Sequence, residues 1–173
     1  MDASETANLV VSDAGPLIHL DELGCLGLLR DFLAIQVPDA VWREVHRHRP
    51  SALRRRTLKL HRVVVPKANL PDLAELAEAL VLDAGELEAL IWMQEYPDAI
   101  FLTDDAAARL AAERLGYKVH GTIGVVIRAL RRKQKTRKQV LNLLRAIPRR
   151  TTLFITPQLL KLALEQVKSE PQA

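Results

Sequence analysis

Cysteine, aromatic residues and long hydrophobic runs are all scarce in this chain. Cys25 is the single cysteine among 173 residues, so the chain cannot form an internal disulfide or a zinc site built on several thiolates. No apolar run approaches the ~18 residues that a membrane span needs, and no signal peptide opens the sequence. We therefore expect a soluble, cytoplasmic protein that has no membrane partner.

Acidic residues are missing from the stretch 114–164, which nevertheless holds 13 of the 25 Lys and Arg residues. A second basic cluster covers residues 43–62. Solvated helix faces explain many basic runs, but segregation this strong favours a polyanionic partner, most simply RNA. Because aromatic residues make up only 4% of the chain, we expect contacts to the phosphate backbone more than base stacking. The residues expected to make such contacts include Arg131, Arg132, Lys133 and Lys135.

Short apolar segments alternate with segments that are apolar at helical spacing. This alternation predicts an α/β fold, a three-layer α/β/α sandwich with a central, mainly parallel sheet. The predicted strands are residues 9–11, 34–38, 63–66, 100–103, 117–121 and 152–156. The predicted helical segments are residues 16–24, 26–32, 38–48, 70–80, 82–96, 106–115, 123–132, 137–147 and 157–168, and residues 50–62 are expected to be a loop or a short helix.

The length and the hydrophobic content of 49% suit one compact domain over residues 1–173. We place its core at about residues 9–130, followed by basic helices and a last strand–helix pair over residues 131–168. The first eight residues and the tail 169–173 are expected to be disordered.

Carboxylates stand at the ends of two predicted strands. Asp13 follows the first strand, and Asp104 and Asp105 follow the strand "IFLT". In open α/β sheets the carboxyl ends of the strands form the ligand-binding rim, so these acids are expected to reach the same edge. Each also has an ordinary structural interpretation, because Asp13 suits the turn before Pro16 and Asp104 suits the N-cap of the following helix.

Two further acids come from predicted helices. Glu44 has an alternative as the partner of Arg47 or His48 one helical turn away. Glu86 stands three residues after Asp83, which is the spacing of a capping box. Together with the strand-end acids, they make four acidic positions on separate elements. Oxygen ligands of this kind suit Mg²⁺ or Mn²⁺, and such ions promote phosphodiester hydrolysis.

Four segments resemble motifs of the PIN-domain family, in the same order. They are "VVSDAGPLIHL", "VPDAVWREV", "LDAGELEALIW" and "FLTDDAAARLAAERLGYKVHGTIGVV", and the resemblance is greatest to prokaryotic members related to VapC-type toxin ribonucleases. The resemblance implies that Asp13, Glu44, Glu86 and Asp104 or Asp105 bind the metal and form the catalytic set. It also implies a homodimer and a small antitoxin partner.

One position departs from the family pattern. Many members carry Ser or Thr two residues after the first Asp, and this chain has Gly15 there. The prediction is a metal-dependent endoribonuclease, the toxin half of a toxin–antitoxin pair. The alternative is a non-catalytic protein of the same fold that binds RNA or a partner, in which the acids only cap helices. A phosphorelay receiver domain is excluded, because its acidic pair would lie near the first strand.

Overall fold

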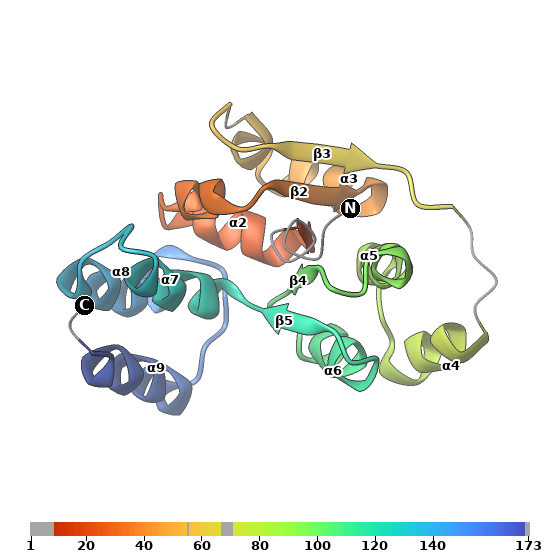
Figure 1. The fold of residues 1–173 in the computed structure, drawn as a ribbon. Helices are drawn as coiled ribbons and strands as arrows, with labels where there is room; N and C mark the ends of the chain where they lie inside the picture. The colour runs from red at the N-terminus through yellow and green to blue at the C-terminus, as the bar shows by residue number, and fades with distance from the viewer. Residues whose placement is uncertain (1–8, 55, 67–70, 172–173) are drawn as a thin grey trace.

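The computed structural model of the chain describes residues 9–54, 56–66 and 71–171. Its described residues form a five-stranded sheet in the order β3-β2-β1-β4-β5, in which all neighbouring strands are parallel (Figure 1). The strands are β1 (Leu9–Ser12), β2 (Ala34–Pro38), β3 (Leu60–Val63), β4 (Ile100–Leu102) and β5 (Lys118–His120). The predicted parallel α/β fold is therefore confirmed.

Helices connect the strands and continue beyond the last one. They are α2 (Ala14–Glu22), α3 (Asp39–His48), α4 (Pro71–Leu80), α5 (Ala84–Glu95), α6 (Ala106–Arg114), α7 (Thr122–Arg131), α8 (Arg137–Arg150) and α9 (Pro157–Ser169), with short 3₁₀ helices η1 (Leu26–Asp31) and η2 (Pro50–Arg54). Side-chain oxygens cap several of them. Thr136, for example, forms a capping box with Gln139 at the start of α8.

Successive side chains of β1 point to opposite faces of the sheet and contribute to two separate layers of the core. Val10 packs against the larger apolar cluster, to which α2, α3, α7, α8 and α9 contribute. Val11 faces the opposite side, where Phe101 of β4 and the buried faces of α4, α5 and α6 complete a second cluster. Successive residues of a strand point to opposite faces, so a fully buried strand supplies both layers. This is the three-layer α/β/α sandwich.

Two strand predictions were wrong. The third strand lies at Leu60–Val63 and not at residues 63–66, because Leu60 pairs with Ile35 and the pairing ends where Val63 meets Pro38. Residues 152–156 are not a strand but the connection between α8 and α9. There the Thr152 N–H donates to a Glu22 carboxylate oxygen at 2.9 Å, which holds the segment against α2 and away from the sheet.

The predicted disorder concerned the two ends of the chain. Residues 1–8 and 172–173, for which disorder was predicted, lie outside the described residues, while α9 continues to Ser169. Among the described residues, no helix combines the length and the apolar character that crossing a bilayer requires.

Candidate active site

The carboxyl ends of β1 and β4 lie side by side at one rim of the sheet. Ser12 pairs with Leu102, so Asp13 and Thr103 leave the sheet together. The Asp13 N–H donates to the Leu102 carbonyl oxygen at 2.8 Å, and the Thr103 hydroxyl donates to Asp13 Oδ2 at 3.3 Å. The rim therefore brings a carboxylate and a hydroxyl that are 90 residues apart in sequence into contact.

Asp13 is buried, with 7% of its surface exposed. It occupies the N-cap position of α2, yet its side chain makes no capping hydrogen bond. The pKa of Asp13 is raised to about 8, chiefly by burial and also by the negative charges of Glu86, Asp83 and Glu44, while a hydrogen bond from the Ala14 backbone opposes the shift. A carboxylate that caps nothing and lies among other acids is not explained by the turn it precedes.

Glu86 does form the capping box that its spacing predicts. Its Oε2 accepts from the Asp83 N–H and its own N–H donates to Asp83 Oδ1, both at 2.9 Å. Burial nevertheless raises the pKa of Glu86 to about 7, and the neighbouring charges of Asp83, Asp105 and Glu44 contribute in the same direction. The cap therefore fixes the side chain at the start of α5 without neutralising it.

Glu44 lies on α3, which packs against α5. Burial raises the pKa of Glu44, and Asp83 raises it further, while His48 and Arg47 oppose the shift. In the described part of the chain, neither basic residue comes within ion-pair distance of the Glu44 carboxylate, so the predicted alternative pair is only a long-range attraction. The negative charges of Asp83 and Glu86 thus interact electrostatically with that of Glu44.

Asp104 has a full set of partners away from these acids. Its Oδ2 contacts His19 Nδ1 at 2.8 Å and accepts from the Thr122 hydroxyl at 2.6 Å, while Oδ1 accepts from the Thr122 N–H at 2.7 Å. These bonds connect β4 with α2 and α7. Gly121 lies against the same carboxylate, because a Cβ there would stand only 2.7 Å from Asp104 Oδ1.

Asp105, and not Asp104, is the N-cap of α6, so the predicted cap was one residue early. Asp105 Oδ1 accepts from the N–H groups of Ala107 and Ala108 at 2.7 and 2.9 Å. Its own N–H donates to the Thr103 hydroxyl, the same hydroxyl that contacts Asp13. The negative charge of Asp105 also raises the pKa of Glu86, which links Asp105 electrostatically to the acid at the start of α5.

These side chains define what we call the acid cluster. Its members are Asp13, Glu44, Asp83, Glu86 and Asp105. None of them forms an ion pair with a Lys or Arg of the described residues, and their oxygen donors suit a hard divalent cation. As the side chains of the described residues lie, no three His, Cys, Asp or Glu are close enough to ligate one ion. Binding an ion would therefore require side-chain rotations that draw the carboxylates inward.

Sequence reasoning missed two members of the site. Asp83 was recognised only as a helix cap, although the capping-box spacing already placed it beside Glu86. Thr103 was assigned to a strand, and the resemblance noted only its spacing from Asp105, while its hydroxyl bonds to both Asp13 and the Asp105 N–H. Both residues depend on contacts between segments that are distant in the chain.

The fold and this rim agree with a family comparison. A family model described as a PIN domain (DUF3368) matches residues 9–169. The chain belongs to the PIN-domain family. Comparisons with curated proteins and with solved structures give no match. PIN domains are generally nucleases, so the parallel α/β architecture of this chain is that of a nuclease family.

Proposed function

We propose that this PIN-domain protein is a metal-dependent endoribonuclease that hydrolyses RNA phosphodiester bonds, and that it is the toxin component of a toxin–antitoxin system. One observation carries the proposal. Asp13 is a buried carboxylate with a pKa of about 8 that caps no helix and shares its surroundings with three other acids. Displaced pKa values of this kind are concentrated at functional sites.

The acids fit a divalent cation by their chemistry. Asp13, Glu44, Glu86 and Asp105 would hold Mg²⁺ or Mn²⁺, with Asp83 beside them. Asp104, whose oxygens are engaged by His19 and Thr122, is the less suitable ligand. A bound ion supplies charge stabilisation for the phosphodiester and lowers the pKa of water at the site.

The chain itself positions the site. The Thr103 hydroxyl orients Asp13 while it accepts from the Asp105 N–H, so one hydroxyl couples two acids. The capping box holds Glu86 at the start of α5. The pKa of about 7 belongs to the metal-free protein, and a bound cation would favour the ionised Glu86 carboxylate.

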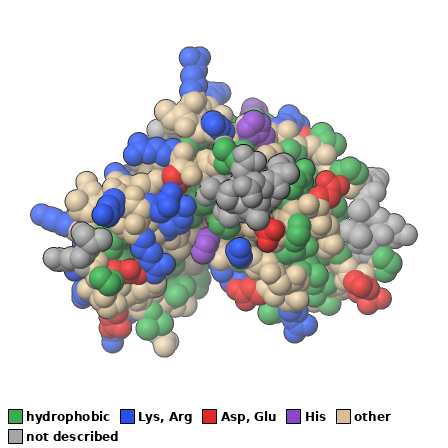
Figure 2. Space-filling model, in the orientation of Figure 1, with side chains coloured by type: hydrophobic (Ala, Val, Ile, Leu, Met, Phe, Trp, Pro, Cys, Tyr) green, Lys and Arg blue, Asp and Glu red, His purple; other side chains and the backbone are tan. Residues whose placement is uncertain are grey.

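RNA binding is assigned to the basic side of the molecule. Figure 2 shows Lys and Arg side chains gathered over the part formed by α7 and α8. The residues proposed to contact the RNA backbone are Arg131, Arg132, Lys133 and Lys135. A small antitoxin and a second copy of the chain are the proposed protein partners.

A non-catalytic binding protein is the second candidate, and one observation favours it. Glu86 and Asp105 both act as helix caps, so part of the acid cluster has a purely structural use. In that case the basic surface would hold RNA and nothing would be cleaved.

The test compares the parent with Asp13→Asn, which keeps the side-chain shape and removes one charge. The exposed Asp98→Asn is the matched control. Cleavage of RNA is measured with Mg²⁺, Mn²⁺ or a chelator, and RNA binding is measured in chelator. We expect the parent and the control to cleave with a metal, and Asp13→Asn to bind RNA equally well without cleaving it. A parent that never cleaves, and whose melting temperature ignores both ions, would favour the binding protein.

A further inference from the structure

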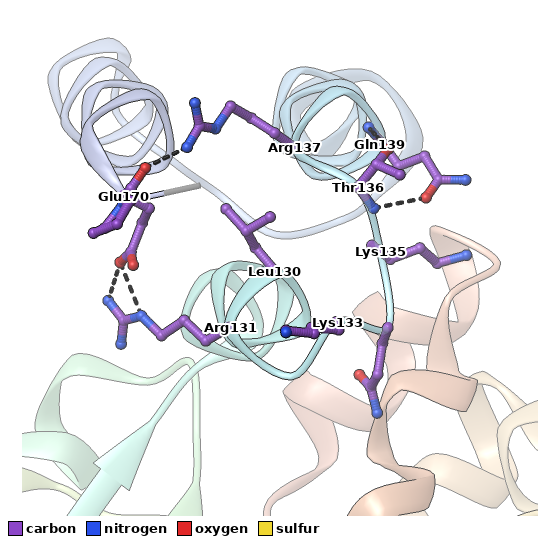
Figure 3. A pocket seen from close by; sticks show the side chains of 10 residues that line it. Leu130, Arg131, Lys133, Lys135, Thr136, Arg137, Gln139 and Glu170 are labelled. Carbon is purple, nitrogen blue, oxygen red and sulfur yellow. Dashed lines mark hydrogen bonds and ion pairs between the residues drawn. The ribbon is translucent and has the colours of Figure 1, made fainter. Parts of the chain in front are cut away.

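Three of the basic residues proposed to contact RNA, Arg131, Lys133 and Lys135, line a cavity of about 700 Å³. It is enclosed by the end of α7, the first turn of α8 and Glu170 just after α9 (Figure 3). Helix α7 begins at Thr122, which binds Asp104, and its ten residues span about 15 Å. The cavity therefore lies at the far end of a helix whose near end touches the rim of the sheet.

Four cations and one carboxylate line this cavity. The cations are Arg131, Lys133, Lys135 and Arg137, and the carboxylate belongs to Glu170. Lys133 and Lys135 have no carboxylate within 4 Å among the described residues. In Figure 3, Lys133 extends along the end of α7 towards Arg131, whereas Lys135 extends in the other direction. Among the described residues that line the cavity, Glu170 is thus the single acid beside four cations.

Glu170 already occupies the cavity as an anion. Its Oε1 accepts from Arg131 Nε at 2.8 Å and from Nη2 at 2.5 Å, and its main-chain oxygen accepts from Arg137 Nη2. The hydrogen bond from Arg131 lowers the pKa of Glu170, so the carboxylate stays ionised at neutral pH. The site therefore shows, with its own side chain, that it accommodates a charged group with several acceptor oxygens.

The donors of the cavity are not fully used by Glu170. Arg137 Nε is buried and finds no acceptor among the described residues, which costs free energy unless a ligand or a rearrangement supplies one. The first turn of the 14-residue helix α8 also faces the cavity, and the positive end of its dipole favours an anion there. Two independent features thus point to an anionic ligand.

We propose that this cavity binds a backbone phosphate of the RNA strand, and that the phosphate displaces Glu170 from Arg131. The inference rests on the proposed function, since it gives Arg131, Lys133 and Lys135 one phosphate of the proposed substrate to bind. None of the described residues that line the cavity is aromatic, which suits a phosphate and not a stacked base. Of the four basic residues that the sequence suggested for RNA binding, only Arg132 lies outside this cavity. Its guanidinium is paired with Asp31 at 3.0 Å.

The first test is the double variant Lys133→Gln/Lys135→Gln, with Lys138→Gln as the control. Lys138 lies on the same helix as Arg137 but does not line the cavity. Binding of a fluorescent single-stranded oligoribonucleotide is measured by anisotropy in chelator at several salt concentrations. Each lost phosphate contact on a single strand lowers the salt slope by about 0.7, so we expect the double variant to lower it by up to about 1.4. The control should match the parent.

The second test is Glu170→Gln, which keeps the shape of the side chain but removes the competing charge. We expect RNA to bind up to about fivefold more tightly, the range that an exposed ion pair allows. An unchanged affinity in this variant, or an unchanged salt slope in the double variant, overturns the proposal. If a poly-glutamate peptide binds through these lysines and RNA does not, the ligand is an acidic protein segment and the proposal is equally wrong.

These outcomes separate the cavity from the proposed activity. If the protein binds RNA through the cavity but never cleaves it, the cavity proposal stands and the endoribonuclease proposal is wrong. If the protein cleaves RNA with a metal, and neither variant changes RNA binding, the endoribonuclease proposal stands and the cavity proposal is wrong.

Discussion

Replacing Asp13 with Asn is expected to make the protein more stable at alkaline pH in metal-free buffer. The pKa of Asp13 is about 8 in the folded protein, compared with an ordinary value of 3.8. Because folding favours the protonated form, the contribution of this group is fully present below about pH 4 and is lost as pH rises towards 8. Asn mimics the protonated form, and its amide oxygen can still accept from the Thr103 hydroxyl.

The size of the effect follows from the same shift. At about 1.4 kcal/mol for each tenfold change in proton affinity, the full displacement corresponds to an upper limit of about 6 kcal/mol. Water penetration and side-chain movement reduce such penalties, so we expect the stability advantage of Asp13→Asn to grow by about 1–3 kcal/mol between pH 5 and pH 8. The measurement is urea unfolding of both proteins in chelator at the two pH values.

The control for this experiment is Asp98→Asn, since Asp98 is exposed in a turn. It should show the same pH dependence as the parent. Mg²⁺ should stabilise the parent and the control but not Asp13→Asn. If Asp13→Asn loses stability with rising pH as steeply as the parent does, Asp13 does not carry a buried charge and the reasoning fails.

Three further substitutions test the rim. Glu86→Gln should abolish RNA cleavage but change the free energy of unfolding by less than about 1 kcal/mol at pH 7. The fold should survive because the amide oxygen of Gln can still accept from the Asp83 N–H, and loss of the fold would contradict this. Gly121→Ala should destabilise by about 1–3 kcal/mol in thermal melts, since its Cβ would stand 2.7 Å from Asp104 Oδ1. Gly15→Ser, by contrast, should change stability by less than about 1 kcal/mol, because its nearest contacts lie at 3.5 Å; a larger loss would show that the site rejects a hydroxyl there.

Much of the fold was predictable because its signals are local. Alternating strand and helix patterns were sufficient for the parallel α/β sandwich, and the capping box of Asp83 and Glu86 formed as its spacing predicts. The failures concerned segments whose structure depends on a partner. Leu60–Val63 became a strand because β2 pairs with it, and residues 152–156 form a connection in which the Thr152 N–H is bonded to Glu22 of α2.

The sequence by itself determined which acids follow strands and begin helices, because strand ends and helix caps depend on residues that are neighbours in the chain. Only the tertiary structure decided how the two acids after β4 are bonded. Thr122 and His19 engage Asp104, while Asp105 caps α6 and its negative charge raises the pKa of Glu86. The same holds for Glu170, whose pairing with Arg131 joins residues 39 positions apart. Electrostatic fields and hydrogen bonds act across space and not along the chain, so no local pattern could have assigned these partners.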